Sequence, residues 1–254
     1  MVIQERDRHL LHELGTMRVI DREQAKVVGR FGSSTRVNAR LLALTRAGLL
    51  RRFFLGWGAT GRKAIYAISR KGAQLVEVPE RGPRQRQDAS IAADFFVEHQ
   101  LAINEVYCEV KYRNRHAHEF PLRRWLTFSS SLTSTRQLIP DGYFELESKA
   151  EVIAAFLEVD LGTERSTVWR KKVENYLQLA VSGEFEHEFH ERKFRVLVVL
   201  DTERRLESIR KTILSLTKKM FWLTTIQSIR ERGIADAKWV RPSGQSQTYV
   251  EKLP

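Results

Sequence analysis

Cysteine and long apolar runs are nearly absent from the sequence, and each absence excludes a class of protein. The one cysteine, Cys108, cannot form an intramolecular disulfide or a zinc cluster with cysteine ligands, and its neighbours predict a buried helix position. No stretch stays apolar over the roughly 20 residues that cross a membrane, and the opening MVIQERDRHL lacks the apolar segment of a signal peptide. No phosphate-binding glycine loop of the P-loop type, GxxxxGK[ST], occurs. We therefore expect a cytoplasmic protein with no membrane partner.

Positive charge is plentiful and is concentrated in the first third of the chain. Of the 43 Lys and Arg residues, 18 lie in residues 1–87, which contain only 7 of the 31 Asp and Glu residues. This part has a net charge of +11, and the remaining residues add +1 to give +12. The length of 254 residues allows one large or two small domains. A basic domain followed by a nearly neutral one suggests a polyanion-binding module attached to a second site, although a basic surface that serves only solubility is the alternative.

The first 78 residues predict an α+β winged helix-turn-helix domain. Apolar residues at helical spacing predict a helix over residues 3–15, ended by Gly15. Asp21 is placed to cap a second helix, with Gln24 at the capping-box position, and a third helix is predicted over residues 34–47. Two strands around the turn GATG then form the wing, and a short helix follows.

In such a domain the third helix enters the major groove of double-stranded DNA. Its polar residues and the basic residues of the wing are therefore the candidate DNA contacts, although some winged helices bind proteins instead. The candidates are Thr35, Arg36, Asn38, Arg40, Arg46, Arg51, Arg52, Arg62 and Lys63.

Residues 79–90 contain two prolines, one glycine and no large apolar residue, which predicts a linker. Residues 91–254 are then the second domain, opened by a long amphipathic helix that carries Glu98, His99 and Glu105. Strands and helices alternate from residue 120 onward, which predicts an α/β fold with a mixed sheet. Within it we expect a charged connection over 181–193, with His187 and His190 as a weak metal-site candidate, and a helix over 221–233.

Carboxylates fall at the ends of two predicted strands of this domain. Asp141 begins the strand PDGYFEL, and Glu158 and Asp160 end the strand IAAFLEVD. Residues two apart on a strand face the same side, so Glu158 and Asp160 can converge, and Asp141 joins them if the strands are neighbours. Three close carboxylates favour a hard divalent cation, Mg²⁺ or Mn²⁺. Solvated acidic residues beside an ordinary turn at 160–163 are the alternative.

The helix that follows places Lys172 and Tyr176 on one face, four residues apart. Together, Pro140-Asp141, then Glu158-Val159-Asp160, then the helix lysine resemble the PD-(D/E)xK nuclease superfamily. The sequence departs from that pattern at Asp160, which occupies the position of the usual lysine, and the resemblance implies that Lys172 or Lys171 replaces it. Metal binding is expected from Asp141, Glu158 and Asp160, with the Val159 carbonyl as a further ligand. Glu98 or Glu105, and His99, are implied as accessory residues, or they form only a polar helix face.

The order PD, then ExDxGT, then KxxxY, after a helix-turn-helix, is similar to the replication-relaxation family of plasmid and mobile-element proteins. The resemblance implies a DNA-binding protein with metal-dependent endonuclease or nicking activity in replication, mobilisation or DNA processing. Tyr176 then supports the lysine or acts as the covalent nucleophile of a nicking reaction. A winged-helix regulator with a degenerate nuclease-like domain is the alternative. A homodimer and other mobile-element proteins are the candidate protein partners.

Overall fold

The chain folds as two units that divide within one long helix, α5. The computed structural model describes residues 2–55, 63–82, 91–132, 137–149 and 151–248. The first unit is Met1–Cys108 and the second is Glu109–Pro254, whereas the sequence predicted a boundary at residue 90. In the described residues no helix has both the length and the apolarity that a membrane crossing requires.

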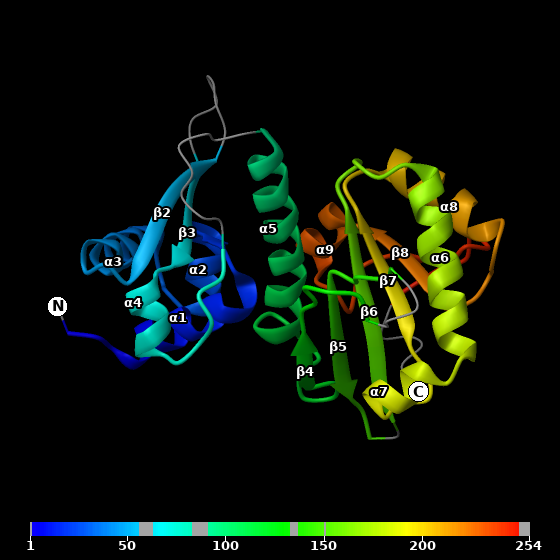
Figure 1. Cartoon of the computed structure of the whole chain (residues 1–254), viewed down its shortest axis with the longest axis horizontal. Coiled ribbons are helices and arrows are strands. Elements are labelled where there is room, and N and C mark those ends of the chain that lie inside the picture. The colour runs from blue at the N-terminus through cyan, green and yellow to red at the C-terminus, as the bar shows by residue number, and fades with distance from the viewer. Residues whose placement is uncertain (1, 56–62, 83–90, 133–136, 150, 249–254) are drawn as a thin grey trace. The chain divides into compact units, whose positions relative to one another are not determined.

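The first unit contains helices that pack around a small antiparallel sheet (Figure 1). Its elements are α1 (Glu5–Met17), β1 (Ile20–Asp21), α2 (Arg22–Val28), α3 (Ser34–Arg46), β2 (Leu50–Leu55), β3 (Lys63–Ile68), α4 (Arg70–Leu75) and most of α5 (Ile91–Lys111). The strand order is β1-β3-β2, and β2 and β3 pair over their full length as a hairpin. The predicted wing tip, with Arg62, lies outside the described residues.

Short polar side chains begin α2 and α3, and the cap at Asp21 is the one that the sequence predicted. Asp21 accepts a hydrogen bond of 2.8 Å from the backbone N–H of Gln24, and Ser33 accepts one of 3.3 Å from Arg36. The Gln24 side chain does not complete a capping box, because it donates to the Leu101 carbonyl at 2.8 Å. The prediction that Gly15 ends the first helix is also wrong: α1 continues to Met17.

Helix α5 belongs largely to the first unit because it completes that unit's core. Its Val97 and Leu101 pack in one apolar cluster with Val19, from the segment between α1 and β1, and with residues of β2 and β3. The Asn104 amide donates to the carbonyls of Met17 and Val19 at 3.0 and 2.6 Å. These contacts explain why the division by packing falls within α5, whereas the linker composition at 79–90 predicted a boundary before it.

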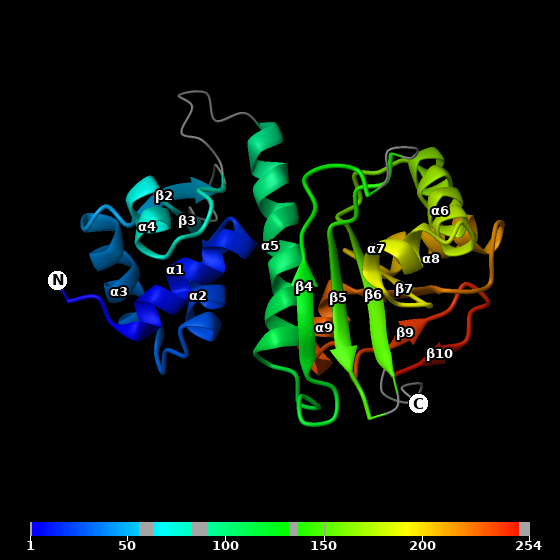
Figure 2. The same cartoon turned by 60° about the horizontal axis from the view of Figure 1, so that its bottom comes forward.

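The second unit is built on a seven-stranded mixed sheet in the order β10-β9-β8-β7-β6-β5-β4. Strands β6, β7 and β8 are parallel and their neighbours are antiparallel. Figure 2 shows β4, β5 and β6 side by side. The elements are β4 (Leu122–Leu126), β5 (Gly142–Glu147), β6 (Val152–Asp160), α6 (Ser166–Val181), α7 (Glu184–Phe189), β7 (Arg195–Leu200), α8 (Glu203–Leu214), β8 (Phe221–Thr225), α9 (Ile226–Arg232), β9 (Trp239–Val240) and β10 (Ser246–Gln247).

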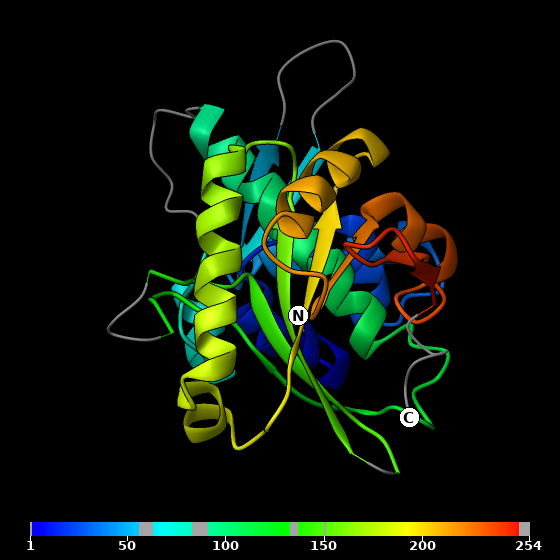
Figure 3. The same ribbon diagram turned by 90° about the vertical axis from the view of Figure 1, so that its right-hand side faces the viewer.

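Helices α6, α7 and α8 pack on one face of this sheet, and Figure 3 shows α6 in yellow-green and α8 in orange in front of the strands. Alternate strand residues such as Phe156, Val198 and Leu223 face these helices and are buried. Two predictions need correction here. Residues 221–233 form strand β8 followed by α9 rather than one helix, and the expected charged connection contains α7, whose Phe185 and Phe189 are buried.

Candidate functional site

The pairing of β5 with β6 brings Asp141 to the end of β6. Gly142 pairs with Leu157 in the antiparallel register, so Asp141 lies at the level of Glu158. The backbone N–H of Asp141 donates to the Leu157 carbonyl at 3.1 Å. In return, the Asp141 carboxylate accepts a 2.7 Å hydrogen bond from the backbone N–H of Val159. The two acidic residues therefore meet as the strand-end pattern predicted.

Glu158 is fully buried and is held by two side chains of α6. The Tyr176 hydroxyl donates to its Oε1 at 2.5 Å, and the Lys172 ammonium donates to its Oε2 at 2.8 Å. Lys172 and Tyr176 are one helical turn apart, which is why both reach the same carboxylate. The neighbouring Lys171 is exposed, so Lys172 is the lysine that the helix presents to this cluster.

A third carboxylate, Glu164, joins the cluster and was missed by the sequence analysis. Its Oε1 accepts a 2.7 Å hydrogen bond from Lys172. Its Oε2 is buried and has no hydrogen-bond partner in the described part of the chain. Glu164 lies in the loop before α6, where no strand or helix period fixes its direction. Only its position within reach of the α6 lysine could have suggested it.

Burial and the neighbouring charges shift the pKa values of this cluster. Burial raises the pKa of Glu158 from 4.5 to about 7; Lys172 opposes this rise and Asp141 adds to it. Burial alone would lower the pKa of Lys172, but the carboxylates of Glu158, Glu164 and Asp141 outweigh it and raise that pKa. Lys172 therefore stays charged, and it is the cation that offsets the acidic residues.

Tyr176 is fully buried, and burial followed by the Glu158 charge raises its pKa well above 10.0. A protonated, enclosed phenol is poorly suited to attack a phosphate. The geometry makes Tyr176 a hydrogen-bond donor to Glu158 rather than a support for the lysine.

Asp160 faces the same side of β6 but is bound to other partners. Its carboxylate accepts hydrogen bonds from the Trp169 indole at 2.6 Å, from Arg205 at 2.6 Å and from the backbone N–H of Gly162 at 2.8 Å. Over the described ranges, no group of three or more His, Cys, Asp and Glu residues is arranged to hold a metal ion. The expected triad of Asp141, Glu158 and Asp160 is therefore not formed, because Asp160 joins β6 to α6 and α8 instead.

Asp141 and Glu158, the two carboxylates that remain, are still the kind of ligand that a small hard cation binds. Mg²⁺ in proteins is commonly held by one or two carboxylates and keeps several waters. Asp141 and Glu158 supply two carboxylates from adjacent strands, and Asp141 contributes to the raised pKa of Glu158, which shows that their charges interact. Each oxygen of Glu158 accepts one hydrogen bond, from Tyr176 or from Lys172, and a carboxylate oxygen keeps a second lone pair that a cation can use.

Other candidates lie elsewhere. Glu98 is exposed and His99 half-buried on the part of α5 that belongs to the first unit, and their accessory role stays a prediction. His187 lies on α7 and His190 ends it, and in the described residues neither belongs to a metal-binding group.

The candidate DNA contacts of α3 divide into two groups. Thr35, Arg36, Asn38 and Arg46 are exposed, as expected of residues that face a groove. Arg40 is not directed outward: its guanidinium pairs with the buried carboxylate of Asp7 and donates to the Val2 carbonyl. The prediction of Arg40 as a DNA contact is corrected accordingly, because helical spacing alone could not show that α1 supplies it with an acidic partner.

The basic residues of the hairpin differ in their freedom to contact a phosphate. Arg51 donates to the Ile68 carbonyl at 3.2 Å and pairs with Glu80 at 3.5 Å. Arg52 is exposed. The Lys63 side chain pairs with Asp21 at 2.5 Å and remains 54% exposed. Arg52, whose guanidinium lies 5.1 Å from the centre of the Phe54 ring, is the one of the three with no acidic partner among the described residues.

Comparison with known proteins places these observations in a family. A family model described as replication-relaxation matches residues 11–197, which is more than half of the chain. No curated protein matches.

Two solved structures are similar at a low level. The crystal structure of Bacillus subtilis PadR in complex with operator DNA has 16% identity and a TM-score of 0.22, over 39% of this chain and 64% of that one. The structure of restriction endonuclease FokI has 10% identity and a TM-score of 0.35, over 89% of this chain and 43% of that one. The chain thus spans less than two thirds of either structure, and both TM-scores are too low to support an argument.

Proposed function

The chain belongs to the replication-relaxation family, and from this membership we propose that it binds double-stranded DNA and cleaves or nicks it during replication or mobilisation of a plasmid or mobile element. The proposal has two parts, a DNA-binding first unit and a phosphodiester-cleaving site in the second unit. Each part has its own support and its own test.

DNA binding is supported by the charge and the exposed residues of the first unit. Residues 1–87 carry a net charge of +11, and the N-terminal half of α3 exposes Thr35, Arg36 and Asn38. In helix-turn-helix proteins this end of the recognition helix contacts base edges. Arg36 is the best-placed base-reading residue of the three, since a guanidinium can donate two hydrogen bonds to guanine.

Cleavage is supported by one observation above all: Asp141, Glu158 and Lys172 converge from three separate segments. Asp141 and Glu158 would hold Mg²⁺ or Mn²⁺, which supplies an activated water and offsets charge that develops on the phosphate. Tyr176 fixes the Glu158 carboxylate through the 2.5 Å hydrogen bond. Lys172 keeps its proton and, once it leaves Glu158, can donate to a phosphate oxygen.

A non-catalytic regulator is the second candidate, and one observation favours it. Lys172 pairs with both Glu158 and Glu164, and Asp160 pairs with Arg205, so these charged contacts also fit a purely structural role. In that case the second unit serves DNA contact, dimerisation or partner docking.

Cleavage of supercoiled plasmid with Mg²⁺ or Mn²⁺ separates the two candidates. We expect the wild-type protein to relax or linearise the plasmid, and Asp141→Ala and Lys172→Ala to abolish this while retaining DNA binding. Lys171→Ala is the matched control, because it removes the adjacent, exposed lysine of the same helix. Wild-type protein that binds DNA but is inert with both metals would leave the regulator as the function.

A further inference from the structure

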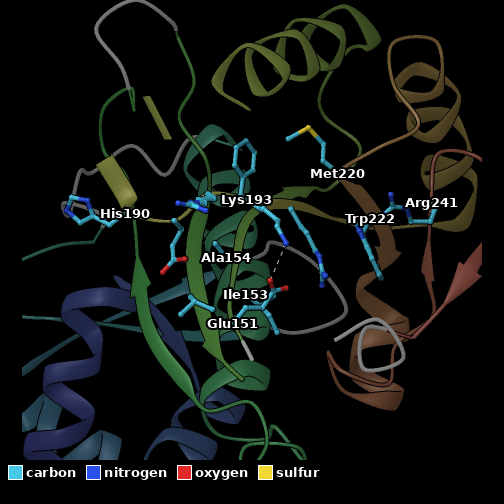
Figure 4. Close-up of a pocket in the computed structure, with 13 residues that line it drawn as sticks. Glu151, Ile153, Ala154, His190, Lys193, Met220, Trp222 and Arg241 are labelled. Atoms are coloured by element: carbon cyan, nitrogen blue, oxygen red, sulfur yellow. Dashed lines mark hydrogen bonds and ion pairs between the residues drawn. The ribbon is translucent and has the colours of Figure 1, made fainter. Parts of the chain in front are cut away.

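A second charged site lies in the second unit, away from the carboxylate cluster. It is a cavity of about 690 Å³ lined by residues from the starts of β6, β7 and β8 and from the segment after β9. Asp141, Glu158 and Lys172 are not among its lining residues, since Glu158 lies near the opposite end of β6. Figure 4 shows the cavity with Trp222 and Arg241 close together on one side.

Basic side chains dominate the lining of this cavity. Four lining residues carry a positive charge: Arg192, Lys193, Arg195 and Arg241. The two acidic lining residues are paired, Glu151 with Lys193 at 3.2 Å and Glu191 with Arg123 at 3.1 Å. The lining of the cavity therefore carries more positive than negative side chains.

Arg195 and Arg241 share one aromatic ring. Their guanidinium carbons lie 5.2 and 4.9 Å from the centre of the Trp222 ring. Attraction to the ring stabilises each cation, but it also holds two like charges near each other. Burial and then the Arg195 charge lower the pKa of Arg241, which reflects the cost of this arrangement. No ion pair between Arg241 and an acidic residue occurs among the described residues.

The guanidinium groups of Arg195 and Arg241 favour a phosphate ligand. A planar guanidinium presents several N–H donors in a fork that fits the oxygens of phosphate, and two such groups match its double negative charge. Trp222 is only 2% exposed, so its ring is not available to stack on a base. Recognition would therefore rest on charge and on donated hydrogen bonds.

We propose that this cavity is a phosphate-binding site in which Arg195 and Arg241 hold the anion against the rim formed by Arg192 and Lys193. The phosphate comes from a DNA strand or from a small phosphorylated molecule. The site is independent of the proposed cleavage, and it stands whether or not the carboxylate cluster is active.

The test is titration of the full chain, with the divalent cation chelated, by inorganic phosphate and by short single-stranded oligonucleotides with and without a 5′-phosphate. Isothermal calorimetry measures affinity, and the indole N–H resonance of Trp222, assigned with Trp222→Phe, reports the place of binding. We expect phosphate to shift that resonance and Arg241→Gln to weaken binding by about tenfold or more, because a charge-assisted contact is lost. Arg230→Gln is the matched control, since Arg230 is exposed on α9 and does not line the cavity.

Two further variants distinguish a loss of phosphate binding from a folding defect. Arg241→Lys keeps the charge without the fork and should bind with intermediate affinity, while Glu151→Gln frees Lys193 and should strengthen binding. Oligonucleotide binding that depends on Arg241 identifies a DNA strand as the source, and binding of inorganic phosphate alone identifies a small ligand. Equal affinities for wild type, Arg241→Gln and Arg230→Gln, or an unmoved Trp222 resonance, would overturn the proposal.

Discussion

At the scale of single residues, Glu158 is a buried carboxylate of the second unit whose ionised form is costly to hold in the fold. It is fully buried, and its negative charge is compensated by one ammonium and one hydroxyl. Burial of a carboxylate disfavours its charged form, and Lys172 recovers only part of this cost. The same carboxylate that would hold a cation therefore destabilises the fold whenever it is ionised.

This balance predicts a pH dependence of stability. The pKa of Glu158 is raised from 4.5 to about 7 in the folded chain, so the folded state binds more protons than the unfolded state between these values. The resulting stabilisation is fully present below about 4.5 and is lost as pH rises through about 7, on the order of 3 kcal/mol in total. Lys172 stays charged in both states across this range, so it adds no slope there.

Urea unfolding at a series of pH values, with divalent cations chelated, measures this contribution. Glu158→Gln removes the titrating group but keeps a buried polar side chain. The difference in the free energy of unfolding between wild type and Glu158→Gln should shift in favour of Glu158→Gln as pH rises through the window. A difference that stays constant with pH would refute the assigned pKa shift.

At the scale of elements, Asp160 determines how α6 meets the sheet. Its carboxylate joins the end of β6 to Trp169 on α6 and to Arg205 on α8, and all three groups are buried or largely buried. This contact fixes the start of α6, and Lys172 lies one helical turn beyond Trp169. We therefore expect Asp160 to act on the site by positioning the helix rather than by binding a cation.

The substitution Asp160→Asn distinguishes a role of Asp160 in positioning α6 from a role in binding the cation. Asp160→Asn keeps the shape but loses the charge opposite Arg205, and we expect a loss of stability of roughly 2 kcal/mol. Mn²⁺ binding, measured by calorimetry, should persist in Asp160→Asn and disappear in Asp141→Asn. If both variants lost Mn²⁺ binding equally while remaining folded, Asp160 would be a ligand after all.

Helix α3 offers a matched pair of arginines for the DNA-binding proposal. Arg36 is exposed, whereas Arg40 neutralises Asp7, whose side chain is fully buried. Arg36→Ala should leave the unfolding free energy unchanged and lower the slope of log affinity against log salt by about one. Arg40→Ala should instead cost roughly 3 kcal/mol of stability, because it leaves a buried carboxylate without its cation. A stability loss in Arg36→Ala with none in Arg40→Ala would reverse the two assignments.

The sequence predicted elements well where one local signal decides them and poorly where packing decides. The cap at Asp21, the strand ends at Asp141 and Glu158, and the helical spacing of Lys172 and Tyr176 are local signals. Residues 221–223 are a short apolar run that periodicity cannot assign to strand or helix, and pairing with β7 and β9 makes 221–225 the strand β8. The partners Glu164, Trp169 and Arg205 come from a loop and two helices, so no local pattern could have joined them to β6.

At the scale of the whole molecule, the division of the chain within α5 predicts which fragment can fold and can be used to test the DNA-binding proposal. A first unit cut before α5 loses Val97 and Leu101 from its apolar cluster. It also loses Asn104, which donates to the Met17 and Val19 carbonyls, and Tyr107, whose hydroxyl donates to Glu13 at 2.6 Å. The basic residues of the unit would remain, but the packing that holds β1 and the hairpin would not.

Fragments 1–90 and 1–111 test this division. We expect 1–111 to unfold cooperatively and to bind DNA with most of the salt dependence of the full chain, because it holds the +11 charge of residues 1–87 on a complete core. Fragment 1–90 should be markedly less stable, by several kcal/mol, since it lacks the buried side chains of α5 and the hydrogen bonds that Leu101, Asn104 and Tyr107 make to the rest of the unit. Circular dichroism during thermal unfolding and fluorescence anisotropy at several salt concentrations measure both properties. Leu101→Ala within 1–111 is the internal control and should lose about 2–5 kcal/mol; equal stability of 1–90 and 1–111 would return the boundary to the linker before α5.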